Sequence, residues 1–241
     1  MPDINKTSID RIINRKIFFG HQSVGKNILG GVSSIVKDHK VKIIDLKDIQ
    51  PESALGPAFY HLRIGSNNDP KSKVDSFSKV IKSNSFINID IAFLKFCYVD
   101  ITKNSNIEEI FNYYKLNFSK LRKEFPNTIF VHLTVPLTKN NDSWKTTVKK
   151  IIGKNDLWEY SDNIQRNRFN EMIFEEYQGK EPVFDLAAVQ STHPDGKREV
   201  FAFKGKTYFA LVKEYTYDGG HLNELGSRRV AASLLKFLAE I

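Results

Sequence analysis

Short apolar runs alternate with segments of helical periodicity along most of this chain. The runs are typical of buried strands, and they lie at residues 16–19, 41–46, 89–97, 128–135 and 182–186. The segments between them repeat apolar residues every three to four positions, as helices with one buried face do. Strands that alternate with helices are joined by crossovers into a parallel sheet. The sequence therefore predicts an α/β fold.

Three regions refine this prediction. Residues 89–97 form the most apolar run, which is typical of the middle of a parallel sheet covered on both faces. Residues 51–69 contain Gly56-Pro57 and a polar run, and we expect a loop there. Residues 199–216 alternate around Lys204-Gly205-Lys206, which predicts a hairpin at an edge. We expect a mainly parallel sheet of five strands with a small added hairpin.

The 241 residues show no internal repeat, low-complexity linker or domain boundary. We therefore expect a single domain over residues 1–241. A polar stretch at about 139–160 contains both tryptophans, Trp144 and Trp158, and is predicted to be an insertion. Its aromatic side chains could stack on a sugar or form a lid, or they could anchor the insertion to the domain.

Composition argues against several function classes. The formal net charge is +8, but the lysines are scattered among acids, so we expect a solvated surface and no nucleic-acid partner. No apolar run approaches the roughly 20 residues needed to span a bilayer. The opening residues lack the apolar centre of a secretory signal, so the default expectation is a cytoplasmic location. The single cysteine, Cys97, excludes an internal disulfide and a cysteine-based zinc site, and we expect a buried structural thiol.

The two ends of the chain carry residues suited to nucleophilic catalysis. Asp218-Gly219-Gly220-His221 places an acid three residues before a histidine in a turn, and this spacing can set a carboxylate against an imidazole. Ser23 lies at a predicted strand-to-helix turn, where an isolated serine would usually be a helix N-cap. Triads are recognised by geometry and roles rather than by sequence order. We therefore predict Ser23, Asp218 and His221 as catalytic residues.

The order of predicted elements, together with Gly20-His21-Gln22-Ser23, Ile64-Gly65-Ser66-Asn67 and Asp218-Gly219-Gly220-His221, resembles the GDSL/SGNH hydrolases, a superfamily of esterases and acylhydrolases. The resemblance implies a three-layer α/β/α sandwich with a flavodoxin-like sheet. It implies that Ser23 is the nucleophile, His221 the base and Asp218 the orienting acid. It also implies cleavage of an acyl or acetyl ester, carried by a small molecule or a carbohydrate, through an acyl-enzyme with no cofactor and no metal.

The chain departs from the pattern of that superfamily in two places. Gly20-His21-Gln22-Ser23 replaces the usual Gly-Asp-Ser and is one residue longer. After the central strand, where the superfamily has Gly-x-Asn-Asp, the chain reads Lys95-Phe96-Cys97-Tyr98-Val99-Asp100 and offers no asparagine. The resemblance therefore implies an oxyanion hole made in one of two ways. Either Asn67 joins the N–H groups of Ser23 and Gly65, or those two N–H groups act alone.

Four side chains near these motifs are predicted substrate contacts: His21, Gln22, Lys95 and Tyr98. His21 could bind substrate or polarise its carbonyl, or its ring could bond the backbone at the strand end. Lys95 lies in an apolar run and needs a partner, so it could be structural or could bind a substrate carboxylate. We expect His132 to be a satisfied core histidine and His193 to lie at the surface.

Two other function classes stay open at the level of sequence. The altered turn and the missing asparagine would suit a binding domain that kept the fold but lost catalysis. His21, Asp218 and His221 have the ligand types of a metal-dependent phosphoesterase.

Overall fold

A computed structural model of the protein describes residues 6–48, 56–83, 88–140 and 158–241. Six strands form the central sheet in the order β2-β3-β1-β4-β5-β6, and every neighbouring pair is parallel. Their bounds are Lys16–His21 (β1), Ile43–Asp45 (β2), Ala58–Arg63 (β3), Ile91–Leu94 (β4), Ile129–Leu133 (β5) and Val183–Phe184 (β6). The expected hairpin consists of β7 (Val200–Phe203) and β8 (Lys206–Phe209).

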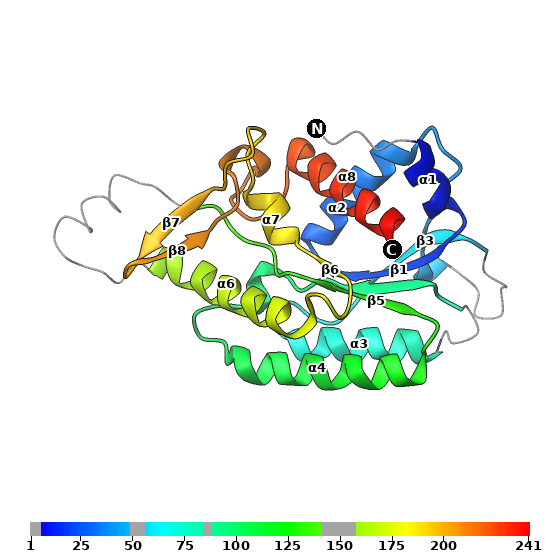
Figure 1. The fold of residues 1–241 in the computed structure, drawn as a ribbon, viewed down its shortest axis with the longest axis horizontal. Helices are drawn as coiled ribbons and strands as arrows, with labels where there is room; N and C mark the ends of the chain where they lie inside the picture. The colour runs from blue at the N-terminus through cyan, green and yellow to red at the C-terminus, as the bar shows by residue number, and fades with distance from the viewer. Residues whose placement is uncertain (1–5, 49–55, 84–87, 141–157) are drawn as a thin grey trace.

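Helices cover both faces of this sheet (Figure 1). One face carries α1 (Lys6–Ile13), α2 (Val24–Val36), α7 (Leu186–Ser191) and α8 (Glu224–Glu240). The other carries α3 (Pro70–Ser83), α4 (Ile107–Glu124) and α6 (Trp158–Tyr177). The three-layer α/β/α sandwich is thus confirmed.

The prediction of five strands was wrong, because β3 lies inside residues 51–69, which we expected to be a loop. Gly56 and Pro57 precede this strand, and its second half, His61-Leu62-Arg63, is too polar to read as buried. β3 nevertheless pairs with β1 on one side and β2 on the other. Hydrogen bonding to two neighbours satisfies its backbone, and its first half, Ala58-Phe59-Tyr60, is buried in the core.

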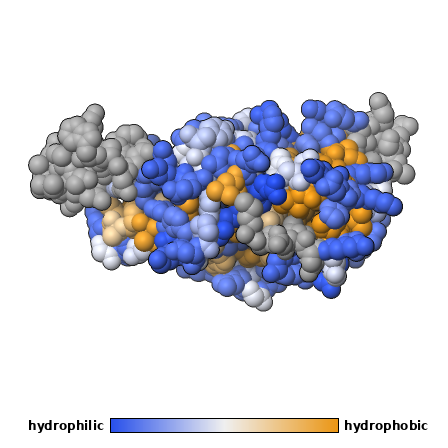
Figure 2. All heavy atoms as spheres, turned by 90° about the horizontal axis from the view of Figure 1, so that it is seen from above, coloured by the Kyte–Doolittle hydropathy of each residue, from blue (hydrophilic) through white to orange (hydrophobic). Residues whose placement is uncertain are grey.

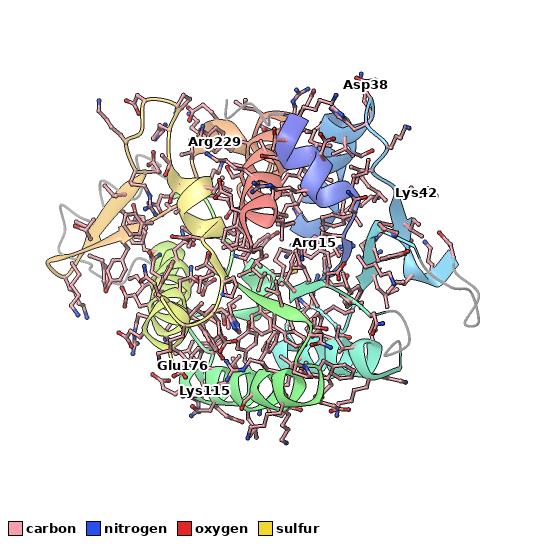
Figure 3. The ribbon with its side chains drawn as sticks, turned by 45° about the vertical axis from the view of Figure 1, so that its right-hand side comes forward. Arg15, Asp38, Lys42, Lys115, Glu176 and Arg229 are labelled. Atoms are coloured by element: carbon pink, nitrogen blue, oxygen red, sulfur yellow. The ribbon has the colours of Figure 1, made fainter. Side chains whose placement is uncertain are left out.

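Alternation along β1 divides the core into two clusters, one on each face of the sheet. Ile17 and Phe19 pack in the cluster under α2 and α8, whereas Phe18 packs in the cluster under α3 and α4. The residues of β1 and β4 are almost completely buried, as expected for central parallel strands. The outer helices are also joined by surface ion pairs, such as Lys115 on α4 with Glu176 on α6 (Nζ–Oε2 2.6 Å; Figure 3).

Most of the described surface seen from above is hydrophilic, with smaller apolar areas between (Figure 2). Among the described residues, no helix is both long enough and apolar enough to cross a membrane. The expected insertion at 139–160 lies mostly outside the described residues, as does Trp144.

The register of the sheet determines what gathers at its carboxyl edge. His21, the last residue of β1, pairs with Arg63, the last residue of β3. Ser23 and Gly65 each follow two residues later, so both leave neighbouring strands at the same level. The topology therefore brings the predicted nucleophile and the predicted oxyanion glycine to one edge, where open α/β sheets bind their ligands.

Candidate active site

Ser23 lies in the turn between β1 and α2, and its backbone is strained. Its φ of 47° and ψ of −110° fall in a region that residues other than glycine rarely adopt, at a cost of about 1–3 kcal/mol. Ser23 occupies the N-cap position of α2, as expected for an isolated serine, but its side chain makes no capping hydrogen bond. Gly25 permits this turn, because a Cβ there would lie 2.4 Å from the Cβ of His21. The hydroxyl is left to bond elsewhere.

That hydroxyl contacts a histidine from the other end of the chain. Ser23 Oγ lies 2.5 Å from His221 Nε2, and His221 Nδ1 lies 2.6 Å from Asp218 Oδ2. A carboxylate can only accept, so it favours the tautomer with the proton on Nδ1. Nε2 is then free to accept the serine proton. The structure brings all three predicted catalytic residues within hydrogen-bond distance.

Asp218 is held in its ionised form. Burial alone would raise its pKa, but hydrogen bonds from Gly220 N–H, the His221 ring and His221 N–H outweigh that effect and lower the pKa to about 2. The turn around it is fixed by Thr216, whose Oγ1 donates to the His221 carbonyl (2.6 Å) and accepts from Gly219 N–H (2.9 Å). The acid and the base are therefore held by one compact turn.

Two tyrosines flank the imidazole of His221. The ring of Tyr98 meets it edge to face at 5.7 Å, and the exposed Tyr217 stacks on it at 6.1 Å. Burial, followed by the charge of Asp218, raises the pKa of Tyr98, so its hydroxyl stays protonated. Beside this turn lies a cavity of about 380 Å³ lined by polar groups that include Asn68, Tyr98, Thr138, Lys139, Asp162 and Arg166. Sequence reasoning missed Tyr217 and Arg166, which carry no local motif.

Three hydrogen-bond donors at this edge have no acceptor among the described residues: the N–H of Ser23, the N–H of Gly65 and Nδ2 of Asn67. Gly65 has a φ of +55°, and a Cβ there would lie 2.5 Å from the backbone nitrogen of Lys73, so only glycine fits. These are the three groups predicted for the oxyanion hole.

Gln22 was predicted to contact substrate, but its amide is already bonded within the protein. Nε2 donates to the carbonyls of Ile64 (3.2 Å) and Gly65 (2.9 Å), and Oε1 accepts from Arg63 Nε (3.2 Å). These bonds tie the turn of Ser23 to the turn of Gly65. With both of its amide atoms engaged, Gln22 holds the two turns together.

Lys95 is completely buried, and its partners lie within its own segment. Nζ donates to the Phe96 carbonyl (3.0 Å) and lies 3.4 Å from Cys97 Sγ. Burial lowers the pKa of this ammonium group. Cys97 is buried and free, as expected. The structural alternative for Lys95 therefore fits this geometry.

His21 is buried beneath the nucleophile turn and faces a second histidine. Its Nε2 lies 3.3 Å from Nδ1 of His61, and its Nδ1 has no hydrogen-bond partner among the residues that the structure describes. Burial, and then the neighbouring His61, lower the pKa of His21 to about 3, so the ring is neutral at ordinary pH. The sequence predicts His61 in a loop near the proposed oxyanion hole, but the structure places it in β3, where it faces His21.

His132 and His193 lie as expected. His132 is buried, contacts Tyr114 (2.7 Å) and Glu181 (3.1 Å), and stacks on Tyr177. His193 pairs with Glu199 at the surface (2.8 Å).

The metal alternative finds no support in this arrangement. It needs His21, Asp218 and His221 in one cluster, but His21 faces His61 whereas His221 bonds Ser23 and Asp218. Within residues 6–48, 56–83, 88–140 and 158–241, no three His, Cys, Asp or Glu side chains are grouped to hold a metal ion.

No protein-family model and no curated protein matches the sequence. The structure is nevertheless similar to the lipase/acylhydrolase from Enterococcus faecalis (12% identity, 94% of this chain and 96% of that chain, TM-score 0.53). It is also similar to a carbohydrate esterase of family 3 from Talaromyces cellulolyticus (12% identity, 93% of this chain and 95% of that chain, TM-score 0.51). A third similar structure is a protein of the G-D-S-L family from Desulfitobacterium hafniense (9% identity, 93% of this chain and 99% of that chain, TM-score 0.52). The chain therefore shares the fold of these proteins, which is the fold that the resemblance seen in the sequence implied.

Proposed function

We propose that this chain, which has the fold of the GDSL/SGNH hydrolases, is a serine hydrolase that cleaves an acyl or acetyl ester. The observation that carries the proposal is the continuous contact from Ser23 Oγ through His221 to Asp218. The known proteins that share the fold include esterases and an acylhydrolase, which supports the same reaction type.

The mechanism follows from this geometry. His221 Nε2 removes the proton of Ser23 as Oγ attacks the ester carbonyl carbon, and Asp218 stabilises the imidazolium that forms. The carbonyl oxygen becomes an oxyanion that accepts from the N–H groups of Ser23 and Gly65 and from Asn67 Nδ2. His221 then gives its proton to the leaving alcohol. Water attacks the acyl-enzyme by the same steps, releases the acid and restores Ser23.

The cavity beside Asp218, which is lined by polar and apolar groups, suggests where the substrate lies. Its lining offers amide, ammonium and carboxylate groups from Asn68, Lys139 and Asp162. Such groups suit the hydroxyls of a carbohydrate or another polar alcohol better than a long acyl chain. We therefore propose a short acyl group, such as acetyl, on a polar alcohol.

Short p-nitrophenyl esters provide the test. We expect Ser23→Ala and His221→Ala each to lower kcat by about 10⁴-fold or more, and a fluorophosphonate to label the wild type but not Ser23→Ala. Ser33→Ala, an exposed serine on α2, and His193→Ala, at the surface, are matched controls that should keep activity. Turnover that survives Ser23→Ala but stops with a chelator would reject the serine mechanism. A lack of both turnover and labelling would favour a binding domain that has lost catalysis.

A further inference from the structure

We propose that a buried ion pair, Lys73 with Asp100, holds the oxyanion loop at residues 65–68 in place and fixes the orientation of the Asn67 amide within it. This inference rests on the proposed serine hydrolase function and adds two positioning residues to it. It also supplies a physical substitute for the asparagine that the chain lacks after β4.

Lys73 and Asp100 come from different parts of the fold and meet behind the site. Lys73 lies in the first turns of α3, and Asp100 ends the short 3-10 helix (Tyr98–Asp100) after β4. Both side chains are fully buried, and Lys73 Nζ donates to Asp100 Oδ2. The pair therefore joins the helix after the oxyanion loop to the end of the central strand.

Asp100 also binds the two backbone segments that it connects. Its Oδ1 accepts from Asn68 N–H (3.0 Å) in the oxyanion loop, and its Oδ2 accepts from Cys97 N–H (2.6 Å) at the end of β4. Each carboxylate oxygen of Asp100 thus accepts at least one hydrogen bond, as a buried charge requires. A single side chain holds the loop against the strand from which the superfamily presents its asparagine.

Lys73 determines which side of the Asn67 amide is presented. Its Nζ donates to Asn67 Oδ1 (3.1 Å), and an ammonium group can only donate, so the oxygen must face it. Nδ2 then lies on the other side of the amide, where it has no acceptor among the described residues. Asn67 is otherwise exposed, and within the part of the chain that the structure describes Lys73 is the one group that hydrogen-bonds its amide. The result is an outward-facing donor, which is the group that an oxyanion hole needs.

The charge of Lys73 has a second effect in the same direction. A cation bonded to the amide oxygen draws electron density from the amide nitrogen, which makes Nδ2–H a better donor. The site therefore gains part of the benefit of a positive charge without placing a lysine against the substrate.

A double-mutant cycle tests this proposal, with kcat and KM measured for a short p-nitrophenyl ester. We expect Asn67→Ala to lower kcat by about 10²-fold, the usual loss of one oxyanion donor, with little change in KM. Introduced alone, Lys73→Met should lower kcat by about 10-fold or more. Introduced into the Asn67→Ala variant, it should lower kcat little further. Losses that multiply in the double variant would overturn the role of Lys73. Lys71→Met is the matched control, because this lysine of the same turn of α3 is partly exposed and pairs with Glu109 at the surface.

Because removal of one partner of a buried pair is strongly destabilising, a second variant leaves Lys73 in place. Asn67→Asp keeps an oxygen for Lys73 but presents another oxygen, and no donor, to the oxyanion. We expect this variant to fold and its kcat to lie below the wild-type kcat by about 10²-fold or more. A kcat equal to that of the wild type would overturn the proposal. If Ser23→Ala abolishes turnover while both Asn67 variants keep it, only this inference fails. If Ser23→Ala keeps turnover, the proposed function fails as well.

Discussion

At the scale of single residues, the site combines strain with tight hydrogen bonding. Ser23 is held in an unfavourable backbone conformation, whereas Asp218 accepts from two backbone N–H groups and from the imidazole. Strain of this kind persists only where the surrounding structure determines it. Here the close packing of Gly25 on His21 provides that constraint.

The role of Asp218 leads to a prediction for Asp218→Asn. An asparagine can turn its NH₂ toward His221 Nδ1 and thereby favour the tautomer that carries its proton on Nε2. That tautomer cannot accept the proton of Ser23, so we expect kcat to fall by about 10⁴-fold, as for the equivalent change in a serine protease. Asp195→Asn is the matched control, because Asp195 lies in an exposed turn, where it bonds Lys197. A loss below 10-fold for Asp218→Asn would show that the contact is not needed for catalysis.

At the scale of elements, the packing of α2 on α8 sets the distance between nucleophile and base. Ser23 directly precedes α2, and His221 lies three residues before α8. Gly31 lets the helices approach closely, because a Cβ there would lie 2.3 Å from the carbonyl oxygen of Ser227. Its neighbour Gly30 faces open space.

The two glycines therefore predict opposite outcomes for the same substitution. Gly30→Ala should raise the free energy of unfolding by about 0.5–1 kcal/mol, since alanine is the better helix former and meets no neighbour. Gly31→Ala should lower it by about 1–3 kcal/mol through overpacking, and should also lower kcat by moving Ser23 relative to His221. Urea unfolding and ester turnover measure both effects. Equal changes in stability for the two variants would contradict this account of the packing.

Sequence patterns identified the strands and motifs that are encoded by residues close together in the chain. Apolar runs marked β1, β4 and β5, and the short spacing in Asp218-Gly219-Gly220-His221 marked the acid and base. β3 was missed because only its first half is apolar and Gly56-Pro57 precedes it, so local composition does not reveal its pairing with β1 and β2. The contacts of Gln22 and Lys73 could not be predicted, since each depends on where a separate element lies in space. Asp100 did stand at the departure from the superfamily pattern, but nothing local indicated Lys73 as its partner.

At the scale of the whole molecule, histidines buried in the neutral form couple stability to pH. Burial lowers the pKa of both His21 and His132, to about 3 for His21. The two side chains lie in different parts of the core, one beneath the site and the other between α4 and α6. Mild acid should therefore destabilise the fold as a whole.

The direction of that effect follows from proton linkage. An unfolded chain binds protons at a histidine near pH 6.5, whereas folded His21 resists protonation down to about pH 3. The contribution of neutral His21 to the free energy of unfolding is therefore fully present above about pH 6.5. It falls by about 1.4 kcal/mol per pH unit as the pH drops from there toward 3. In urea unfolding between pH 6 and 4.5, His21→Gln should show a shallower decline than the wild type by roughly that slope. His39→Gln, at an exposed position, should follow the wild type. An identical decline in all three proteins would mean that His21 is able to take up a proton in the folded state.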